Sequence, residues 1–301
     1  MSPSGILPAA ITPRRAGAVE IDLARALELI DFLGGHGVDG ITLLGSTGEF
    51  PHFTPEDRIR FASMATKRSR VPVLVNASHS TLDGAEEIAR AAIGGGAAGV
   101  LIMPPNYYRY SQESIRAFCL EFAGRVDGPV YLYNIPQFTS PLEVETSLDL
   151  LTTGAFAGIK DSYGRWEDFV KLQASGLPVF LGADTMYSRA ARAGAAGAIS
   201  GVASVLPELM VAIDRAARAG KDTSALDEKV AAFADRAMRF PFPIAFRDAL
   251  AIRGIDPGPH ASPLGPEESK KLAEFRGWFG EFLQDITYAP PDGGASKRNS
   301  R

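Results

Sequence analysis

The side chains best suited to chemistry lie in three short motifs, and the most informative is a lysine. Residues 157–161 read Ala-Gly-Ile-Lys-Asp, an apolar run that ends in Lys160. An ammonium is costly to bury, so a crowded site favours the neutral amine, which can attack a carbonyl carbon. A lysine at the end of a strand can also point into water. Lys160 alone does not separate these alternatives.

The other two motifs offer an anion site and a proton carrier. Residues 45–49, Gly-Ser-Thr-Gly-Glu, predict a glycine turn whose N–H groups and hydroxyls can hold a carboxylate. The same hydroxyls could satisfy their own backbone instead. Tyr133 ends the run Val-Tyr-Leu-Tyr, so its phenol could transfer protons or belong to the core. Together, a buried amine, a phenol and a carboxylate-binding turn suit imine formation with a 2-oxo acid.

The remaining polar candidates point to structure rather than chemistry. Asp184 follows a Gly-Ala pair, and this position predicts that its carboxylate caps the next helix. The four histidines lack the spacing of metal ligands, so we expect no metal site. They are His36, His52, His79 and His260.

Short apolar runs that alternate with helical patterns predict the elements that position these groups. The eight predicted strands are residues 5–12, 40–44, 71–76, 99–103, 130–134, 158–160, 179–182 and 198–200. Several are apolar at consecutive positions, which is typical of parallel strands buried on both faces. The helices between them begin with capping hydroxyls at Thr54, Thr81 and Ser111.

Eight such units imply an α/β fold, the parallel (β/α)8 barrel, in which active residues follow the carboxyl ends of the strands. A doubly wound open sheet is the alternative, but the Gly-x-Gly-x-x-Gly turn that it would normally show is missing. We expect residues 1–220 to form the barrel and residues 221–287 to form a helical extension. The predicted helices of the extension are 225–240, 243–253 and 266–283. Residues 288–301 have the composition of a disordered tail.

Composition excludes several classes of protein. The chain has 301 residues, 46% of them hydrophobic, and a formal net charge of -4, so it can bury a large core but predicts no nucleic-acid surface. Cys119 is the only cysteine, which suits the reducing cytoplasm. No apolar run approaches the roughly 18 residues of a membrane span, and no signal peptide is evident. We therefore expect a cytoplasmic protein.

The order and spacing of three motifs resemble a known family. Residues 45–49, 133–136 (Tyr-Asn-Ile-Pro) and 158–161 look like the dihydrodipicolinate synthase / N-acetylneuraminate lyase family of pyruvate-dependent class I aldolases. The resemblance extends to about Leu283. It implies a (β/α)8 barrel with a C-terminal helical extension, usually a homotetramer built as a dimer of dimers, that needs no cofactor. Its reactants would be pyruvate and a small aldehyde or 2-oxo-3-deoxy acid.

The resemblance also implies roles for individual residues. Lys160 would form the Schiff base with pyruvate. Tyr133 would be the acid/base, linked through Thr47 to Tyr107 of the partner subunit. The implied substrate-binding residues are Gly45, Ser46, Thr47, Phe138, Ser162, Gly182, Asp184, Thr185, Ile199 and Gly201.

Departures from the family pattern concern the second substrate. True dihydrodipicolinate synthases have an arginine where this chain has Phe138, and an apolar ring cannot replace a bidentate guanidinium. Sialic acid lyases have an acidic residue and a serine where this chain has Thr185 and Gly201. The remaining expectation is an aldolase for a 2-oxo-3-deoxy sugar acid such as 2-keto-3-deoxygluconate, whose hydroxyls would meet Ser162, Asp184 and Thr185.

Other functions stay open at this point. They are 4-hydroxy-tetrahydrodipicolinate synthase, N-acetylneuraminate lyase and a related 2-oxo-acid dehydratase. A non-enzymatic alternative is a catalytically silent regulator that binds a 2-oxo acid.

Overall fold

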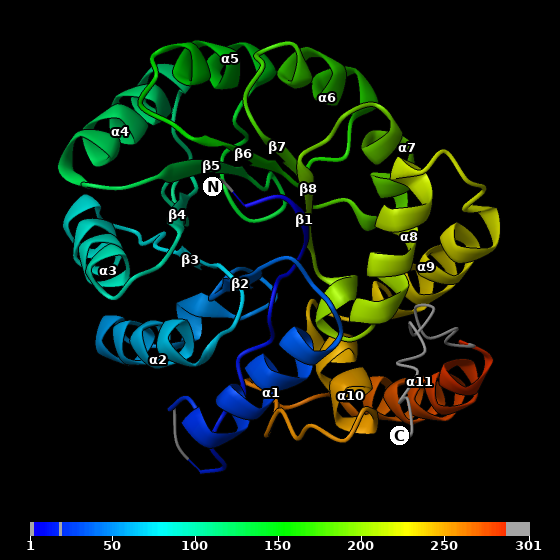
Figure 1. Ribbon diagram of the computed structural model, residues 1–301. Helices are drawn as coiled ribbons and strands as arrows, with labels where there is room; N and C mark the ends of the chain where they lie inside the picture. Colours follow the sequence, from blue (N-terminus) through cyan, green and yellow to red (C-terminus); the bar gives the residue numbers. More distant parts are fainter. Residues whose placement is uncertain (1–2, 18–19, 287–301) are drawn as a thin grey trace, which may run out of the picture.

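A ring of eight parallel strands forms the centre of the molecule. The computed structural model describes residues 3–17 and 20–286 (Figure 1), so the predicted tail at 288–301 lies outside the described residues. Every residue of the strands is buried, as expected for parallel strands that are covered on both faces. The strands are β1 (Gly5–Pro8), β2 (Ile41–Leu43), β3 (Val73–Asn76), β4 (Gly99–Ile102), β5 (Val130–Asn134), β6 (Gly158–Asp161), β7 (Val179–Leu181) and β8 (Gly197–Ser200).

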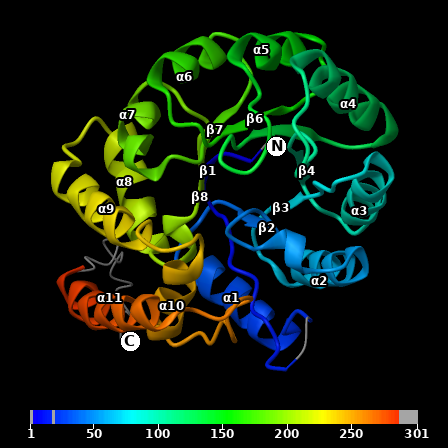
Figure 2. The same ribbon diagram turned by 180° about the vertical axis from the view of Figure 1, so that it is seen from behind.

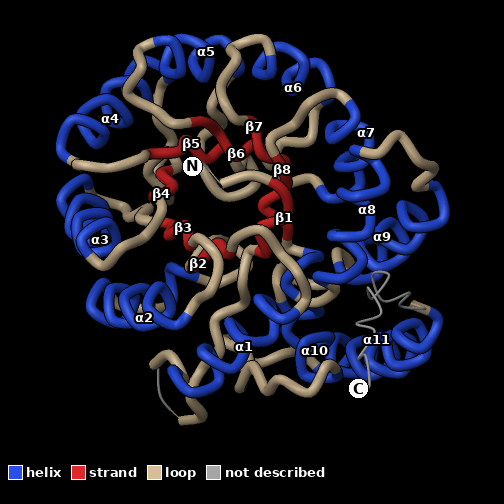
Figure 3. Tube along the Cα trace, in the orientation of Figure 1, coloured by secondary structure: helices blue, strands red, loops and turns tan. Residues whose placement is uncertain are grey.

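The strand order closes the sheet into a barrel. Neighbouring strands pair in the order β1-β8-β7-β6-β5-β4-β3-β2. The two ends meet through a parallel bridge between Ala9 and Thr42, and the Ala10 N–H donates to the Thr42 carbonyl at 2.9 Å. Figure 3 shows the strands inside a ring of helices. The fold is therefore the predicted (β/α)8 barrel, and the open doubly wound sheet is excluded.

Within the described residues, eight helices cover the outside of the barrel, and three of them begin at the predicted caps. Thr54 accepts from the Asp57 N–H, Thr81 from the Gly84 N–H, and Ser111 from the Ser114 N–H. The helices are α1 (Leu23–Gly35), α2 (Pro55–Arg68), α3 (Leu82–Gly94), α4 (Gln112–Arg125), α5 (Val144–Thr152), α6 (Trp166–Gln173), α7 (Tyr187–Arg192) and α8 (Pro207–Arg218). Short 3-10 helices are η1 (Phe50–His52), η2 (Asp184–Met186) and η3 (Val202–Ser204).

The predicted capping role of Asp184 was wrong. The side chain of Asp184 caps neither η2 nor α7. Its Oδ2 accepts instead from the Val202 N–H at 3.0 Å, at the start of η3. Because β7 and β8 are neighbours, the loops that follow them meet, and this carboxylate bonds across the two loops rather than to its own helix.

Three further helices follow the barrel in the described part of the chain and pack beside α8 and α1 (Figures 1 and 2). They are α9 (Ser224–Ala237), α10 (Ile244–Ile252) and α11 (Pro266–Asp285), close to the predicted ranges. Phe233 of α9 contacts Phe246 of α10 and Phe279 of α11, with ring centroids 5.3 and 5.6 Å apart. This aromatic cluster joins the three helices into one layer. None of the helices in the described ranges is long and apolar enough to cross a membrane.

Candidate active site

Lys160 lies inside the barrel near the carboxyl end of β6. Only 4% of its surface is exposed, so the alternative that it points into water is excluded. The register of β5 and β6 pairs Tyr133 with Lys160, and the Lys160 Nζ lies 4.1 Å from the centroid of the Tyr133 ring. Adjacent residues of neighbouring parallel strands point to the same face, which is why the amine and the phenol meet.

Gly182, directly after β7, leaves room for the lysine. A Cβ at this position would overlap the Ser162 hydroxyl and lie 3.1 Å from the Lys160 Cε. Any side chain here would therefore displace the lysine or Ser162. Glycine at the end of β7 is a steric requirement of the site.

A hydroxyl of the turn after β2 contacts the phenol of Tyr133. Ser46 Oγ and Tyr133 Oη share a hydrogen bond of 3.2 Å. The link through Thr47 that the resemblance implies stays a prediction. Thr47 is also buried and lines the same cavity.

A cavity of about 400 Å³ opens above Lys160 and collects most of the predicted residues. Those that line it are Lys160, Tyr133, Ser46, Thr47, Phe138, Ser162, Gly182, Asp184, Thr185, Ile199 and Gly201. Two predicted residues do not line it. Gly45 lies one residue before the part of the turn that faces the cavity. Tyr107 lies on the loop after β4 and is 86% exposed.

Several lining residues were missed from the sequence, and four of them belong to the C-terminal helices and the loop between them. Ala234, Met238, Phe242 and Phe246 form an apolar side of the cavity. Phe138 joins this side, since its ring centroid lies 6.2 Å from that of Phe242. No spacing relates these residues to the strand ends. The other missed residues lie in the loops after β5, β6, β7 and β8: Ile135, Gln137, Tyr163, Gly164, Ala183, Met186 and Val202.

The charges at the site are few. Lys160 is the only cation and Asp184 the only acid among the described residues that line the cavity. Burial raises the pKa of Asp184, although hydrogen bonds from Ser200 and Val202 and the nearby Lys160 act in the opposite direction. Burial also raises the pKa of Asp161, despite the hydrogen bond from Asn134. Among the described residues that line the cavity, there is therefore no second cation to bind another anionic group.

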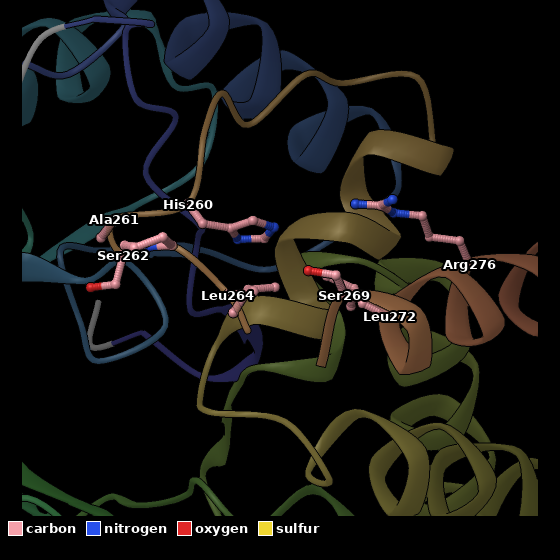
Figure 4. Close-up of a pocket in the computed structure, with 8 residues that line it drawn as sticks. His260, Ala261, Ser262, Leu264, Ser269, Leu272 and Arg276 are labelled. Atoms are coloured by element: carbon pink, nitrogen blue, oxygen red, sulfur yellow. The ribbon is translucent and has the colours of Figure 1, made fainter. Parts of the chain in front are cut away.

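A separate cavity of about 510 Å³ lies on the C-terminal helices, away from these residues (Figure 4). His260 and Arg276 point toward one another across it; the His260 Nε2 lies 3.1 Å from a carboxylate oxygen of Asp248, and Arg276 forms an ion pair with the same carboxylate. None of the residues predicted for the site lines this cavity. Across the described ranges, no group of three His, Cys, Asp or Glu side chains could hold a metal ion.

Comparison with known proteins identifies the family. The model of the dihydrodipicolinate synthetase family matches residues 2–279. The chain belongs to this family. An uncharacterized DapA-like lyase of Chloroflexus aurantiacus is 31% identical over 297 residues, covering 95% of this chain and 99% of the relative. A 4-hydroxy-tetrahydrodipicolinate synthase of Salinibacter ruber is 32% identical over 288 residues, covering 88% and 91%.

Comparison with a solved structure shows that the similarity extends to the fold. The 2-keto 3-deoxygluconate aldolase of Picrophilus torridus superposes with a TM-score of 0.81 at 25% identity, covering 87% of this chain and 97% of that one. The resemblance drawn from the three motifs is thereby confirmed. The protein is an enzyme, a pyruvate-dependent class I lyase.

Proposed function

We propose that Lys160 forms a Schiff base with pyruvate, and that the enzyme cleaves or forms a 2-oxo-3-deoxy sugar acid such as 2-keto-3-deoxygluconate. The proposal rests above all on the buried Lys160 amine, which lies 4.1 Å from the ring centroid of Tyr133 in a cavity of about 400 Å³. A buried lysine beside a phenol is suited to attack a ketone.

The chemistry begins at the ketone carbon of the 2-oxo acid. The neutral Lys160 amine attacks this carbon, a C–N bond forms, and the ketone oxygen leaves as water after taking up protons through Tyr133. Ser46 and Thr47, with the N–H groups of their turn, hold the carboxylate. The resulting iminium accepts the electron pair when the C3–C4 bond breaks.

Cleavage requires one further proton transfer. The C4 hydroxyl loses its proton as the C3–C4 bond breaks, which releases an aldehyde and leaves an enamine of pyruvate on Lys160. Protonation of C3 and hydrolysis of the imine then release pyruvate and restore the amine. Tyr133 lies within reach of Lys160 and shares a hydrogen bond with Ser46, so the phenol can exchange protons in both halves of the cycle.

The second reactant is inferred from the walls of the cavity. Ser162, Asp184 and Thr185 line one side and suit the hydroxyls of a sugar acid. Phe138 offers no partner for a second carboxylate, which disfavours 4-hydroxy-tetrahydrodipicolinate synthase. The names of the relatives divide between that synthase and 2-keto 3-deoxygluconate aldolase, so they support the lyase class and leave the substrate open. N-acetylneuraminate lyase and a 2-oxo-acid dehydratase would use the same Schiff base on different second reactants.

A homotetramer built from paired subunits forms part of the proposal. Tyr107 is strongly exposed and has a positive φ of 80°, which is uncommon for a residue other than glycine. A second cavity, of about 190 Å³, adjoins the first and is lined by Ser46 and Phe138 among others. The buried Oδ1 of Asn106, at the same cavity, has no hydrogen-bond partner in the described structure. Tyr107 of the partner subunit would fill this cavity and join the proton relay, which the resemblance routes from Tyr133 through Thr47.

The Schiff base is tested directly by reduction. Borohydride added with pyruvate should attach a stable mass to Lys160 and inactivate the enzyme, while Lys160→Ala should gain no mass. A wild-type protein that gains no mass would contradict the Schiff-base mechanism. Tyr133→Phe should keep the fold and slow turnover, and unchanged turnover would remove Tyr133 from the relay.

The substrate is tested by measuring pyruvate release from 2-oxo-3-deoxy acids, sialic acid and 4-hydroxy-2-oxoglutarate. Release from 2-keto-3-deoxygluconate supports the proposal, and release from sialic acid alone contradicts it. Saturable trapping of pyruvate without cleavage of any of these acids would favour the silent regulator. The cytoplasmic location expected from the sequence stays a prediction.

A further inference from the structure

The turn that would hold the pyruvate carboxylate adopts an unusual backbone. Leu44 and Glu49 have φ values of 58° and 52°, in the left-handed region that residues other than glycine seldom enter. Such a conformation costs free energy and persists only where the surroundings impose it. The two residues flank Ser46 and Thr47, so whatever holds them also sets the direction of both hydroxyls.

Each end of the turn is held by a different buried side chain. At the far end, Arg247 forms an ion pair of 2.6 Å with the Glu49 carboxylate. At the near end, the Asn76 Nδ2 donates to the Leu44 carbonyl at 2.8 Å. Asn76 lies at the end of β3 and is completely buried, so no water competes for this hydrogen bond.

The orientation of the Asn76 amide is itself fixed by a network. The Ser78 hydroxyl donates to the Asn76 Oδ1 at 2.7 Å and accepts from the Met103 N–H at 3.0 Å. Arg58 Nη2 donates to the main-chain carbonyls of Asn76 and Ser78, at 2.9 and 3.0 Å. Since the Oδ1 already accepts from Ser78, the Nδ2 is the atom left to face Leu44. All of these groups are buried.

The guanidinium of Arg58 makes the network stiff. Arg58 is 2% exposed, and burial lowers its pKa to about 10, which still leaves it charged at neutral pH. The guanidinium carbon of Arg58 lies 4.9 Å from the centroid of the Phe50 ring. Among the described residues, no carboxylate forms an ion pair with Arg58. A buried cation bonded to carbonyls holds the carboxyl end of β3 and the residues after it in one geometry.

We propose that Asn76 is a positioning residue for the 2-oxo acid: it holds Leu44 in the left-handed conformation that directs Ser46 and Thr47 toward Lys160. The inference rests on the proposed function, because the carboxylate is what the turn would bind. Asn76 does not line the cavity and touches no reacting atom. Its effect is therefore on the binding of pyruvate and not on the reactivity of the amine.

The test measures borohydride trapping of Lys160 against pyruvate concentration. In Asn76→Ala, we expect the half-saturating pyruvate concentration to rise about tenfold or more, because a displaced binding group lowers the fraction of productive complexes. Trapping at saturating pyruvate should stay complete, because Lys160 and Tyr133 are unchanged. A merely destabilised protein would instead trap less at every concentration.

Two further variants keep the outcome interpretable. Thr42→Val is the matched control, because Thr42 is buried on β2 and its Oγ1 has no hydrogen-bond partner among the described residues. It should leave half-saturation unchanged. Ser78→Ala frees the Asn76 amide to rotate and should raise half-saturation by a smaller factor. If circular dichroism shows that Asn76→Ala does not fold, the half-saturating pyruvate concentration of Ser78→Ala tests the proposal in its place.

The possible failures are distinguishable. A wild-type enzyme that is not trapped at all overturns the proposed Schiff base. A trapped wild type, with the Asn76 and Ser78 variants trapped at the same half-saturating concentration, leaves the proposed function in place and overturns the positioning role of Asn76.

Discussion

Ser46 and Thr47 are neighbours in the sequence, yet their hydroxyls have different partners. The Ser46 hydroxyl is bonded to the Tyr133 phenol at 3.2 Å. The Thr47 Oγ1 faces the loop after β8, since it lies 3.6 Å from the position that a Cβ on Gly201 would take. Both residues line the cavity, but among the described hydrogen bonds it is the Ser46 hydroxyl that reaches the phenol.

This difference predicts different kinetic defects. Ser46→Ala should lower kcat by roughly 10²-fold, the usual contribution of a positioned proton-transfer group, and also raise the KM, because this hydroxyl bonds the phenol and would help to hold the carboxylate. Thr47→Val, which keeps the shape of the side chain, should mainly raise the KM for the 2-oxo acid. Steady-state kinetics with pyruvate release as the readout checks both. Equal defects in kcat would contradict the separate roles.

Asp161, next to Lys160, predicts how stability depends on pH. Its Oδ1 accepts from Asn134 at 2.8 Å, but its Oδ2 is buried without a partner in the described structure. Burial raises its pKa above the ordinary value of 3.8. The folded state therefore binds this proton more tightly than the unfolded state. The free energy of unfolding that this carboxyl contributes is present below pH 3.8, and it is lost as the pH rises from 3.8 through the pKa of the folded state.

Asp161→Asn removes the ionisable group and keeps an acceptor for Asn134. Relative to wild type, its free energy of unfolding should rise with pH over that interval and then level off. Urea unfolding at several pH values measures the difference. Asp222→Asn is the control, because the hydrogen bonds from Ser224 lower the pKa of Asp222 and its effect should have the opposite sign. A pH-independent difference for Asp161→Asn would contradict the prediction.

At the scale of the elements, a buried ion pair connects the turn after β2 to the C-terminal helices. Arg247 of α10 is 1% exposed and bonds the Glu49 carboxylate at 2.6 Å and the Thr12 carbonyl at 3.1 Å. The Nη2 of Arg247 donates to the carbonyls of Pro257 and Pro259. This guanidinium therefore holds the extension to the loops of β1 and β2. The domain boundary near residue 220 stays a prediction.

Arg247→Met should destabilise the protein by about 3 kcal/mol, the low end for breaking a buried pair, because Glu49 loses its partner at 2.6 Å and keeps Arg14 at 4.0 Å. It should also weaken trapping of pyruvate, since Glu49 ends the turn that includes Ser46. Arg239→Met is the control, because the ion pair of Arg239 with Asp235 is exposed and contributes little. Thermal unfolding and borohydride trapping measure the two effects. Similar losses in both variants would show that the buried pair has no special role.

At the scale of the whole molecule, the proposed function requires a second subunit to complete the site. The C-terminal extension supplies Met238, Phe242 and Phe246 to the cavity, so the barrel and the extension share it. Tyr107, in contrast, does not line the cavity of its own chain and is 86% exposed. In a symmetric dimer, the same surface of each copy forms the interface. If that surface includes the loop after β4, each Tyr107 reaches the other subunit.

Complementation between subunits tests this arrangement. Tyr107→Phe and Lys160→Ala should each have greatly reduced activity. Refolded together, they should recover part of it, because a mixed dimer contains one site with an intact Lys160 and an intact Tyr107 of the partner subunit. Sedimentation should show an oligomer. A monomeric wild type, or no recovery in mixtures that do form hybrids, would contradict the shared site.

The sequence by itself determined the barrel and the position of Lys160 near the end of a strand. Parallel strands buried on both faces are apolar at consecutive positions, so the run 158–160 could be recognised as a strand and Lys160 placed at its end. The capping hydroxyls of α2, α3 and α4 act within three residues of the chain, so they too were predictable. Signals of this kind depend on neighbours in the sequence.

Only the tertiary structure decided which of these groups meet. The bond of Ser46 to Tyr133, the bond of Asp184 to Val202 and the ion pair of Glu49 with Arg247 span long stretches of the chain, 198 residues in the last case. Such contacts follow from the curvature of the barrel and the packing of α10, and they leave no periodic pattern in the sequence. Local preferences encode elements, whereas the partners of buried polar groups are set when distant elements pack together.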